Sequence, residues 1–153
     1  MRSVASSVTV VTTDGPAGRH GATVSAFCSV SADPPTALIC LNAGSRIAGL
    51  VAANGIFNVN VLPQGATDIA ERFAGAHDGA IIDRFDGIEC EGGAAPAIAG
   101  ATVLSCRTVQ EMHSGSHRIF VGHVHALYGG VERPLTYLNG AYHSVVPQHI
   151  PCE

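Results

Sequence analysis

Short runs rich in β-branched and apolar residues follow one another along most of this chain, separated by turn signals that contain glycine, proline or aspartate. Such runs are typical of β-strands, and the signals between them are typical of tight turns. Residues 14–18 (Asp-Gly-Pro-Ala-Gly) and 33–35 (Asp-Pro-Pro) are two of these turns. The pattern predicts strands over residues 7–13, 20–30, 36–41, 56–62, 101–112, 117–128 and 135–145.

Helical spacing is confined to two short segments. Ser45 suits the N-cap of a helix that ends before Gly55, and a second helix is expected over residues 68–74. Residues 75–100 are rich in glycine and alanine, so we expect them to wind over the surface, with a short strand near Ile88.

These elements predict one domain over residues 1–153, mainly β with a few short helices, folded as a closed or nearly closed antiparallel barrel. A chain of 153 residues can bury a sizeable core. The strand over residues 36–41 is apolar on both faces and therefore needs a cover on each side. We expect this cover to be the interface of a homodimer.

Composition excludes several classes of function. The net charge of −4 comes without a basic stripe, so neither nucleic acid nor a membrane is expected as a partner. The chain contains no lysine, which excludes a P-loop ATPase and a pyridoxal-phosphate enzyme, because each needs one. A Rossmann fold and a serine hydrolase lack support, because the G-x-G-x-x-G and G-x-S-x-G motifs are absent.

The five cysteines are scattered and form no C-x-x-C motif. An odd number of cysteines, without a signal peptide or an apolar run of bilayer length, favours a reducing, cytoplasmic location. We expect each cysteine to be a small residue of the core.

A row of small hydroxyl residues is the first candidate for ligand binding. Thr23, Ser25, Ser29 and Ser31 have the same parity, so in an unbroken strand they would face the same way. Small hydroxyls let a flat ligand approach the backbone and form hydrogen bonds along its edge. An ordinary polar strand face would show the same pattern.

The predicted helix start at Gly44-Ser45-Arg46 is the second candidate. A helix N-terminus offers free N–H groups and a partial positive charge, and an arginine adds a bidentate phosphate donor. The sequence therefore predicts a phosphate site here, with a capped surface helix as the alternative.

Histidines gather near the last long strand. His123 and His125 fall on one face of it, and a barrel that binds a metal through them is an alternative function. The spacing offers no third zinc ligand, however, so we expect no metal site. His117 stands where a glycine turn meets the strand and could present its imidazole to a pocket. The carboxylates that flank Arg84, in contrast, indicate a solvated turn over residues 83–86.

Several motifs stand in a fixed order: GATVSAFCSVS at residues 21–31, FNVNVL at 57–62, RFAG at 72–75, GSH at 115–117 and IFVG at 119–122. With them, the chain resembles the short-chain flavin reductase family, the reductase components of two-component flavin monooxygenases. It is most similar to the reductases that serve 4-hydroxyphenylacetate 3-monooxygenase and the pyrimidine-degradation monooxygenase. Further matching segments are residues 8–19, 33–35, 40–42, 83–85, 134–135, 137 and 142–143.

The resemblance implies a split β-barrel homodimer that binds one flavin, FMN or FAD, per subunit near the dimer interface. It implies hydride transfer to that flavin from NADH or NADPH, and release of the reduced flavin to a separate monooxygenase. The residues that it places along the isoalloxazine and ribityl chain are Thr23, Val24, Ser25, Ser29, Val30 and Ser31. Those that it places at the phosphate end and the rest of the flavin pocket are Ser45, Arg46, Arg72 and Phe73. Those beside the nicotinamide are the catalytic candidate His117, with Tyr142 and His143.

Two positions depart from the family pattern. Many relatives have an aspartate where Ser116 stands, and many have an arginine where Ala141 stands. These departures keep a second interpretation open, in which the protein binds flavin as an electron carrier and does not itself oxidise NAD(P)H.

Overall fold

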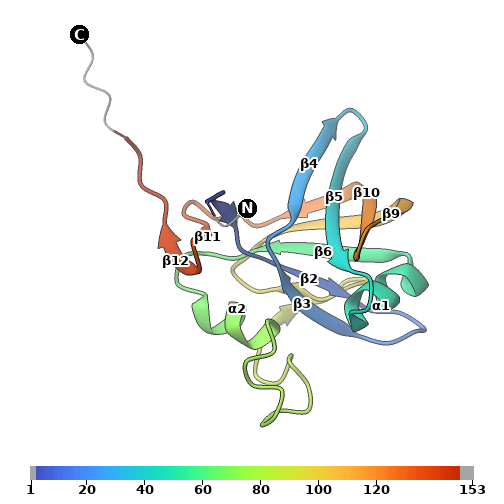
Figure 1. Cartoon of the computed structure of the whole chain (residues 1–153), viewed down its shortest axis with the longest axis horizontal. Coiled ribbons are helices and arrows are strands. Elements are labelled where there is room, and N and C mark those ends of the chain that lie inside the picture. Colours follow the sequence, from blue (N-terminus) through green and yellow to red (C-terminus); the bar gives the residue numbers. More distant parts are fainter. Residues whose placement is uncertain (1–2, 149–153) are drawn as a thin grey trace.

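The computed structural model describes residues 3–148, and within them the chain is mainly β with two helices (Figure 1). Seven antiparallel strands form one sheet in the order β3-β2-β6-β9-β10-β5-β4, and smaller sheets join β1-β11-β12 and β7-β8. The elements are β1 (Ser6–Ser7), β2 (Thr9–Thr13), β3 (His20–Val24), β4 (Phe27–Ala32), β5 (Pro35–Asn42), α1 (Arg46–Asn54), β6 (Ile56–Val61), α2 (Thr67–Phe73), β7 (Cys90–Glu91), β8 (Ala97–Ile98), β9 (Thr102–Ser114), β10 (His117–Tyr128), β11 (Leu135–Leu138) and β12 (Ala141–Ser144).

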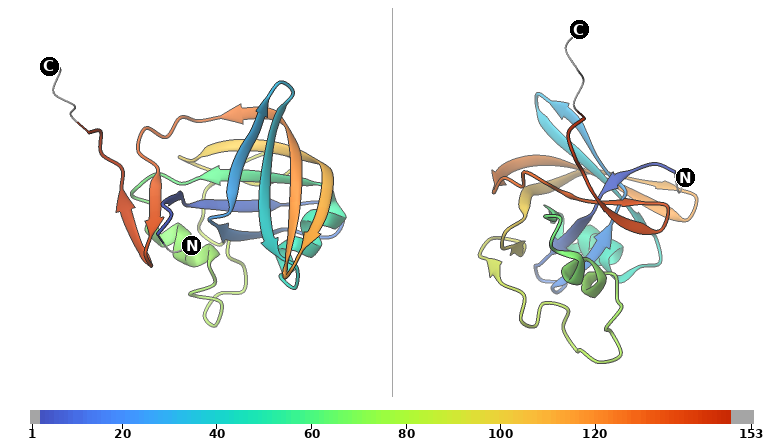
Figure 2. Two further views of the ribbon diagram at one scale, coloured as in Figure 1. Left: turned by 45° about the horizontal axis from the view of Figure 1, so that its top comes forward. Right: turned by 90° about the vertical axis from the view of Figure 1, so that its left-hand side faces the viewer.

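The seven-stranded sheet is strongly curved but does not close (Figure 2). Among the described strands, β3 and β4 each pair with a neighbour on one side only. We expected a closed or nearly closed barrel, and the expectation of a closed barrel is therefore wrong. The strand expected over residues 20–30 is broken at Ser25 and Ala26, so β4 leaves β3 and pairs with β5 instead.

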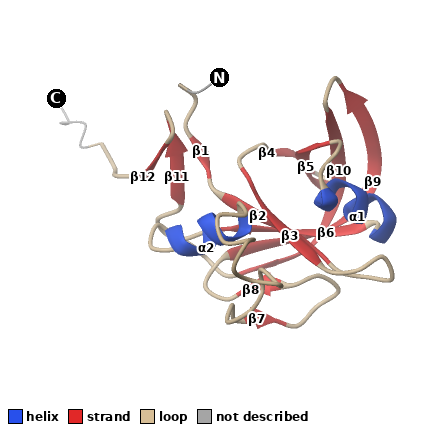
Figure 3. Cartoon of the chain, turned by 60° about the horizontal axis from the view of Figure 1, so that its bottom comes forward, coloured by secondary structure: helices blue, strands red, loops and turns tan. Residues whose placement is uncertain are grey.

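Strand β2 is buried on both faces because two cores meet there. Val11 packs in a core with α1 and the inner residues of β5 and β6, whereas Val10 packs in a second core with α2 and residues 97–103. Figure 3 shows α2 and the β7–β8 segment on one side of the sheet and α1 at its end. The central strands are thus covered by this chain itself. We expected β5 to be covered on both faces, but it buries only alternate residues.

Two asparagines of β6 hold the glycine- and alanine-rich segment against the sheet. Asn58 donates to the carbonyl of Ala95 at 2.9 Å, and the side-chain oxygen of Asn60 accepts from the N–H of Ile98 at 2.8 Å. This segment forms the strand pair β7–β8, so the strand expected near Ile88 lies two residues later.

Helix α1 confirms its predicted ends. Ser45 is the N-cap, and Gly55 ends the helix in the left-handed conformation at φ 70°. Helix α2 lies within one residue of its prediction, with Asp68 in the first turn and Arg72 in the last, which suits the helix dipole.

The single strand expected over residues 135–145 is instead a hairpin of β11 and β12. Asn139 and Gly140 connect the two strands, and both have positive φ, at 53° and 85°. Asn-Gly is a strong signal for a two-residue hairpin turn. The hairpin was therefore readable in the sequence, and the prediction of one strand was wrong.

The cysteines divide between core and surface. Cys106 is buried as expected, and burial raises the pKa of its thiol to about 12. Cys28 and Cys90 are exposed, so the prediction of a core position is wrong for them, and Cys152 lies outside the described residues. Within residues 3–148, neither helix has the length and apolar character needed to cross a bilayer.

Candidate functional site

A cleft of about 270 Å³, here called the β3–α1 cleft, lies between the end of β3, the end of β5 and the start of α1. It brings together five of the predicted site residues, which come from three separate parts of the chain: Thr23, Val24, Ser25, Ser45 and His117. Leu41 and Ile47 add apolar walls, and Asn42 adds an amide. The cleft therefore combines apolar surface with a few polar groups, as is typical of sites for small molecules and cofactors.

A second cleft, of about 190 Å³, adjoins the first and is here called the β3–β12 cleft. It is lined by Tyr137 and Tyr142, whose rings pack edge to face with centroids 5.5 Å apart. Residues 23–25 line both clefts, so a ligand along the end of β3 would reach His117 on one side and Tyr142 on the other. Desolvation, and then the nearby charge of Glu71, raise the pKa of the Tyr142 hydroxyl, which therefore stays protonated at neutral pH.

The predicted row of hydroxyls is not a row in the structure. The Thr23 hydroxyl points to α2, where it donates to the carbonyl of Ala70 at 2.6 Å. Ser25 lies in the link between β3 and β4, and a bulge shifts the register between Ser29 and Ser31. The expectation that these hydroxyls share one face is wrong, because it required an unbroken strand.

Ser45 and Arg46 differ in what they offer to an anion. The Ser45 hydroxyl donates to the carbonyl of Asn42 at 2.6 Å and accepts from the N–H of Ala48 at 3.4 Å, so it is occupied in capping α1. Arg46 is exposed, and its guanidinium has no hydrogen-bonding or ion-pair partner among residues 3–148. The guanidinium and the N–H groups of Arg46 and Ile47 are therefore the donors available to a phosphate, because the N–H of Ala48 is bonded to Ser45.

His117 begins β10 and is exposed in the β3–α1 cleft. Its Nδ1 lies 3.0 Å from the hydroxyl oxygen of Ser116, the residue that departs from the family pattern. The Ser116 hydroxyl can donate to this nitrogen or accept from it, so the contact is available to either imidazole tautomer.

The other predicted residues lie away from these clefts. Ser29, Val30 and Ser31 are exposed on the β4 arm of a hairpin, and His143 is exposed with its Nε2 3.2 Å from the carbonyl oxygen of Leu138. Arg72 donates to the carbonyl of Asp86, and Phe73 is fully buried against Phe85. Their roles in flavin binding stay predictions that rest on the resemblance.

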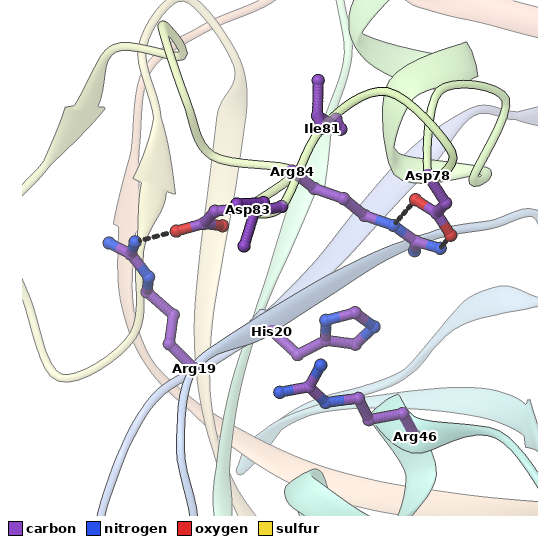
Figure 4. Close-up of a pocket in the computed structure, with 8 residues that line it drawn as sticks. Arg19, His20, Arg46, Asp78, Ile81, Asp83 and Arg84 are labelled. Atoms are coloured by element: carbon purple, nitrogen blue, oxygen red, sulfur yellow. Dashed lines mark hydrogen bonds and ion pairs between the residues drawn. The ribbon is translucent and has the colours of Figure 1, made fainter.

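A third cavity, of about 360 Å³, was missed by the sequence analysis and is here called the arginine pocket (Figure 4). It is lined by four basic residues and two carboxylates, with two isoleucines: Arg19, His20, Arg46, Arg84, Asp78, Asp83, Ile81 and Ile82. The expectation of a solvated turn at residues 83–86 is wrong for Arg84, whose side chain is only 18% exposed. Arg84 donates to the carbonyls of Gly21 and Phe73 at 3.0 and 2.8 Å and forms a bidentate pair with Asp78.

The alternative of a metal site at His123 and His125 finds no support in the structure. Both side chains are exposed on β10. No group of three potential metal ligands occurs within residues 3–148.

Comparison with known proteins identifies the family. The model of the flavin reductase like domain matches residues 1–146, almost the whole chain. The chain belongs to this family. A curated relative, the FMN reductase (NADH) RutF of Ancylobacter novellus, is 40% identical over 149 residues, which cover 95% of this chain and 81% of the relative.

Solved structures agree with this assignment. The NADH:FAD oxidoreductase of Streptomyces globisporus, solved with NAD and FAD fragments, is 31% identical and superposes with a TM-score of 0.87 over 97% of this chain and 90% of its own. The flavin reductase component of a bacterial two-component tryptophan halogenase is 29% identical, with a TM-score of 0.84 over 96% and 94% of the two chains.

Proposed function

We propose that this protein is an NAD(P)H:flavin oxidoreductase that reduces FMN or FAD and supplies the reduced flavin to a partner monooxygenase. One observation carries the proposal: residues 23–25, Ser45 and His117 converge on one cleft in a chain that belongs to the flavin reductase family. Of the relatives named above, one is an FMN reductase (NADH), one is an NADH:FAD oxidoreductase, and one is the flavin reductase component of a two-component halogenase.

The clefts fit a flavin. Residues 23–25 form a short stretch of small side chains that borders both the β3–α1 cleft and the β3–β12 cleft, so a flat ring can lie along it. Arg46 and the first turn of α1 would hold the phosphate, and Leu41 and Ile47 would exclude water from the ring. When bound, the flavin supplies the acceptor for the hydride of the nicotinamide.

His117 would border the nicotinamide and hold it over the flavin. Orientation of two bound rings contributes strongly to the rate, because it removes most of the entropic cost of their meeting. The hydrogen bond with Ser116 fixes the imidazole for this role without a carboxylate. No protein nucleophile is needed.

The assembly that we propose is a homodimer of split β-barrels. The open edge between β3 and β4 and the curvature of the sheet support a split barrel. Exposed apolar side chains on β4, β9 and β10 support a second copy as the cover: Val30, Val109, Met112, Leu127 and Tyr128. A cytoplasmic location would suit both NAD(P)H and a diffusing reduced flavin.

The test is steady-state oxidation of NADH, and separately NADPH, with FMN, FAD or no flavin. We expect flavin-dependent turnover that falls about tenfold or more in His117→Ala, mainly through a higher KM for the nicotinamide. His125→Ala, an exposed histidine on the same strand, is the control and should match the wild type. Bound flavin without turnover on either nicotinamide would refute the reductase and leave the electron carrier.

A further inference from the structure

The arginine pocket holds one cation, Arg46, that no carboxylate within residues 3–148 neutralises. Arg84 is paired with Asp78 at 2.6 Å, and Arg19 is paired with Asp83. Arg46 reaches the same cavity from α1, and in the part of the chain that the structure describes no carboxylate pairs with it. The pocket therefore has a net positive charge beside the start of the helix.

His20 lies next to this free cation, and Figure 4 shows its ring beside the guanidinium of Arg46. Burial lowers the pKa of His20, and Arg84 and Arg46 lower it further, while Asp78 and Asp83 offset only part of the effect. Arg19, the residue before β3, also lines the pocket and is paired with Asp83. These are the charged groups that line the pocket with His20, so an anion placed there would relieve the repulsion between the imidazolium and the guanidinium groups.

The arginine pocket and the β3–α1 cleft meet at the helix start. Ser45 lines the cleft, and the next residue, Arg46, lines the pocket. A ligand with its ring along residues 23–25 can therefore extend a phosphate past Ser45 to Arg46 and His20. The cavity of about 360 Å³ leaves room for a second phosphate as well.

Resting on the proposed function, in which Arg46 holds the phosphate of the flavin nucleotide, we propose that His20 is a second ligand of that phosphate and takes up a proton as the phosphate binds. The ligand chemistry is a phosphate ester, which FMN offers as a monoester and FAD as a pyrophosphate. His20 is neutral in the free protein at neutral pH because its pKa is lowered, and a phosphate beside it reverses that effect. By linkage, affinity for the phosphate rises as pH falls.

The experiment compares the dissociation constants of FMN, FAD and riboflavin between about pH 8 and about pH 6, the range that brackets an ordinary histidine. We expect wild-type affinity for FMN, relative to riboflavin, to rise as pH falls, and His20→Gln to abolish this rise. The phosphate of free FMN is itself protonated at about pH 6, and this contribution is the same in the experiments with either protein. The difference in pH dependence between wild type and His20→Gln therefore isolates His20.

Arg46→Gln should weaken FMN about tenfold and leave riboflavin unchanged, because riboflavin lacks the phosphate. The matched controls are His125→Gln and Arg133→Gln, which replace exposed residues outside the pocket and should behave as wild type. If FAD but not FMN shows the effects, the proposal holds with the pyrophosphate as the anion.

Calorimetry of wild-type protein gives a second measurement that does not depend on how the variants fold. Titration with FMN in two buffers of different ionisation enthalpy should show proton uptake that is absent with riboflavin. The same titration is made with FAD. If His20→Gln matches wild type in affinity and pH dependence for both FMN and FAD, or wild type takes up no proton with either, the proposal is wrong. Reduction of riboflavin by NADH would then show that the proposed function still stands, whereas failure to bind or reduce any flavin would overturn both.

Discussion

Asn60 offers a quantitative test of how the fold is held together. Its side chain is fully buried in β6 and makes three hydrogen bonds. The amide nitrogen donates to the carbonyl of Val10 at 2.9 Å and to the hydroxyl of Thr12 at 3.1 Å, and the oxygen accepts from the N–H of Ile98 at 2.8 Å. One side chain therefore joins β2, β6 and β8.

Replacing Asn60 with alanine removes all three bonds. The N–H of Ile98 would be left buried without this partner, which costs about 1–3 kcal/mol, and each bond lost to Val10 and Thr12 costs about a further 0.5–1.5 kcal/mol. We expect the free energy of unfolding to fall by about 3 kcal/mol, well above the usual effect of a surface substitution.

The assay is urea unfolding of flavin-free protein at one fixed protein concentration, because bound flavin and the proposed dimerisation would each add apparent stability. Gln64→Ala, at an exposed position, is the control and should change the free energy by less than about 0.5 kcal/mol. Amide exchange at Ile98 should accelerate in Asn60→Ala. A loss of unfolding free energy no larger than that of the control would refute the reasoning that this amide holds the 95–98 segment against the sheet.

Two further predictions concern packing and charge. In Gly122→Ala the new Cβ would lie 2.7 Å from Cζ of Phe57 and 2.9 Å from Cβ of Cys106, so we expect a loss of about 1–3 kcal/mol in the same unfolding assay, and full stability would show that the core relaxes around the methyl. The N–H of Phe85, and then the Arg19 guanidinium, hold the pKa of Asp83 below its usual value, so this carboxylate stabilises the fold above its unfolded pKa and that contribution is lost as pH falls below about 4. In Asp83→Asn, the free energy of unfolding should depend less steeply on pH in acid than in wild type. The same pH dependence as in wild type would contradict this assignment.

The sequence was sufficient to predict those elements whose structure is determined by neighbouring residues. The N-cap at Ser45 and the stop at Gly55 fixed α1, and the β-branched run gave β10 its observed bounds. The order of short motifs gave the family, and residues 23–25, Ser45 and His117 do meet in one cleft. In each case neighbouring residues determine the backbone, and the motif spacing then determines which segments come together.

The tertiary structure decided whatever depends on partners far away in the chain. The break at Ser25 lets β4 pair with β5, and the side chain of Thr23 points to α2, where it bonds to Ala70. Arg84 looked like part of a solvated turn, yet it is held by the carbonyls of Gly21 and Phe73. The arginine pocket exists because such long-range bonds bring basic residues from separate segments to one cavity. No local sequence pattern shows that these residues lie close together.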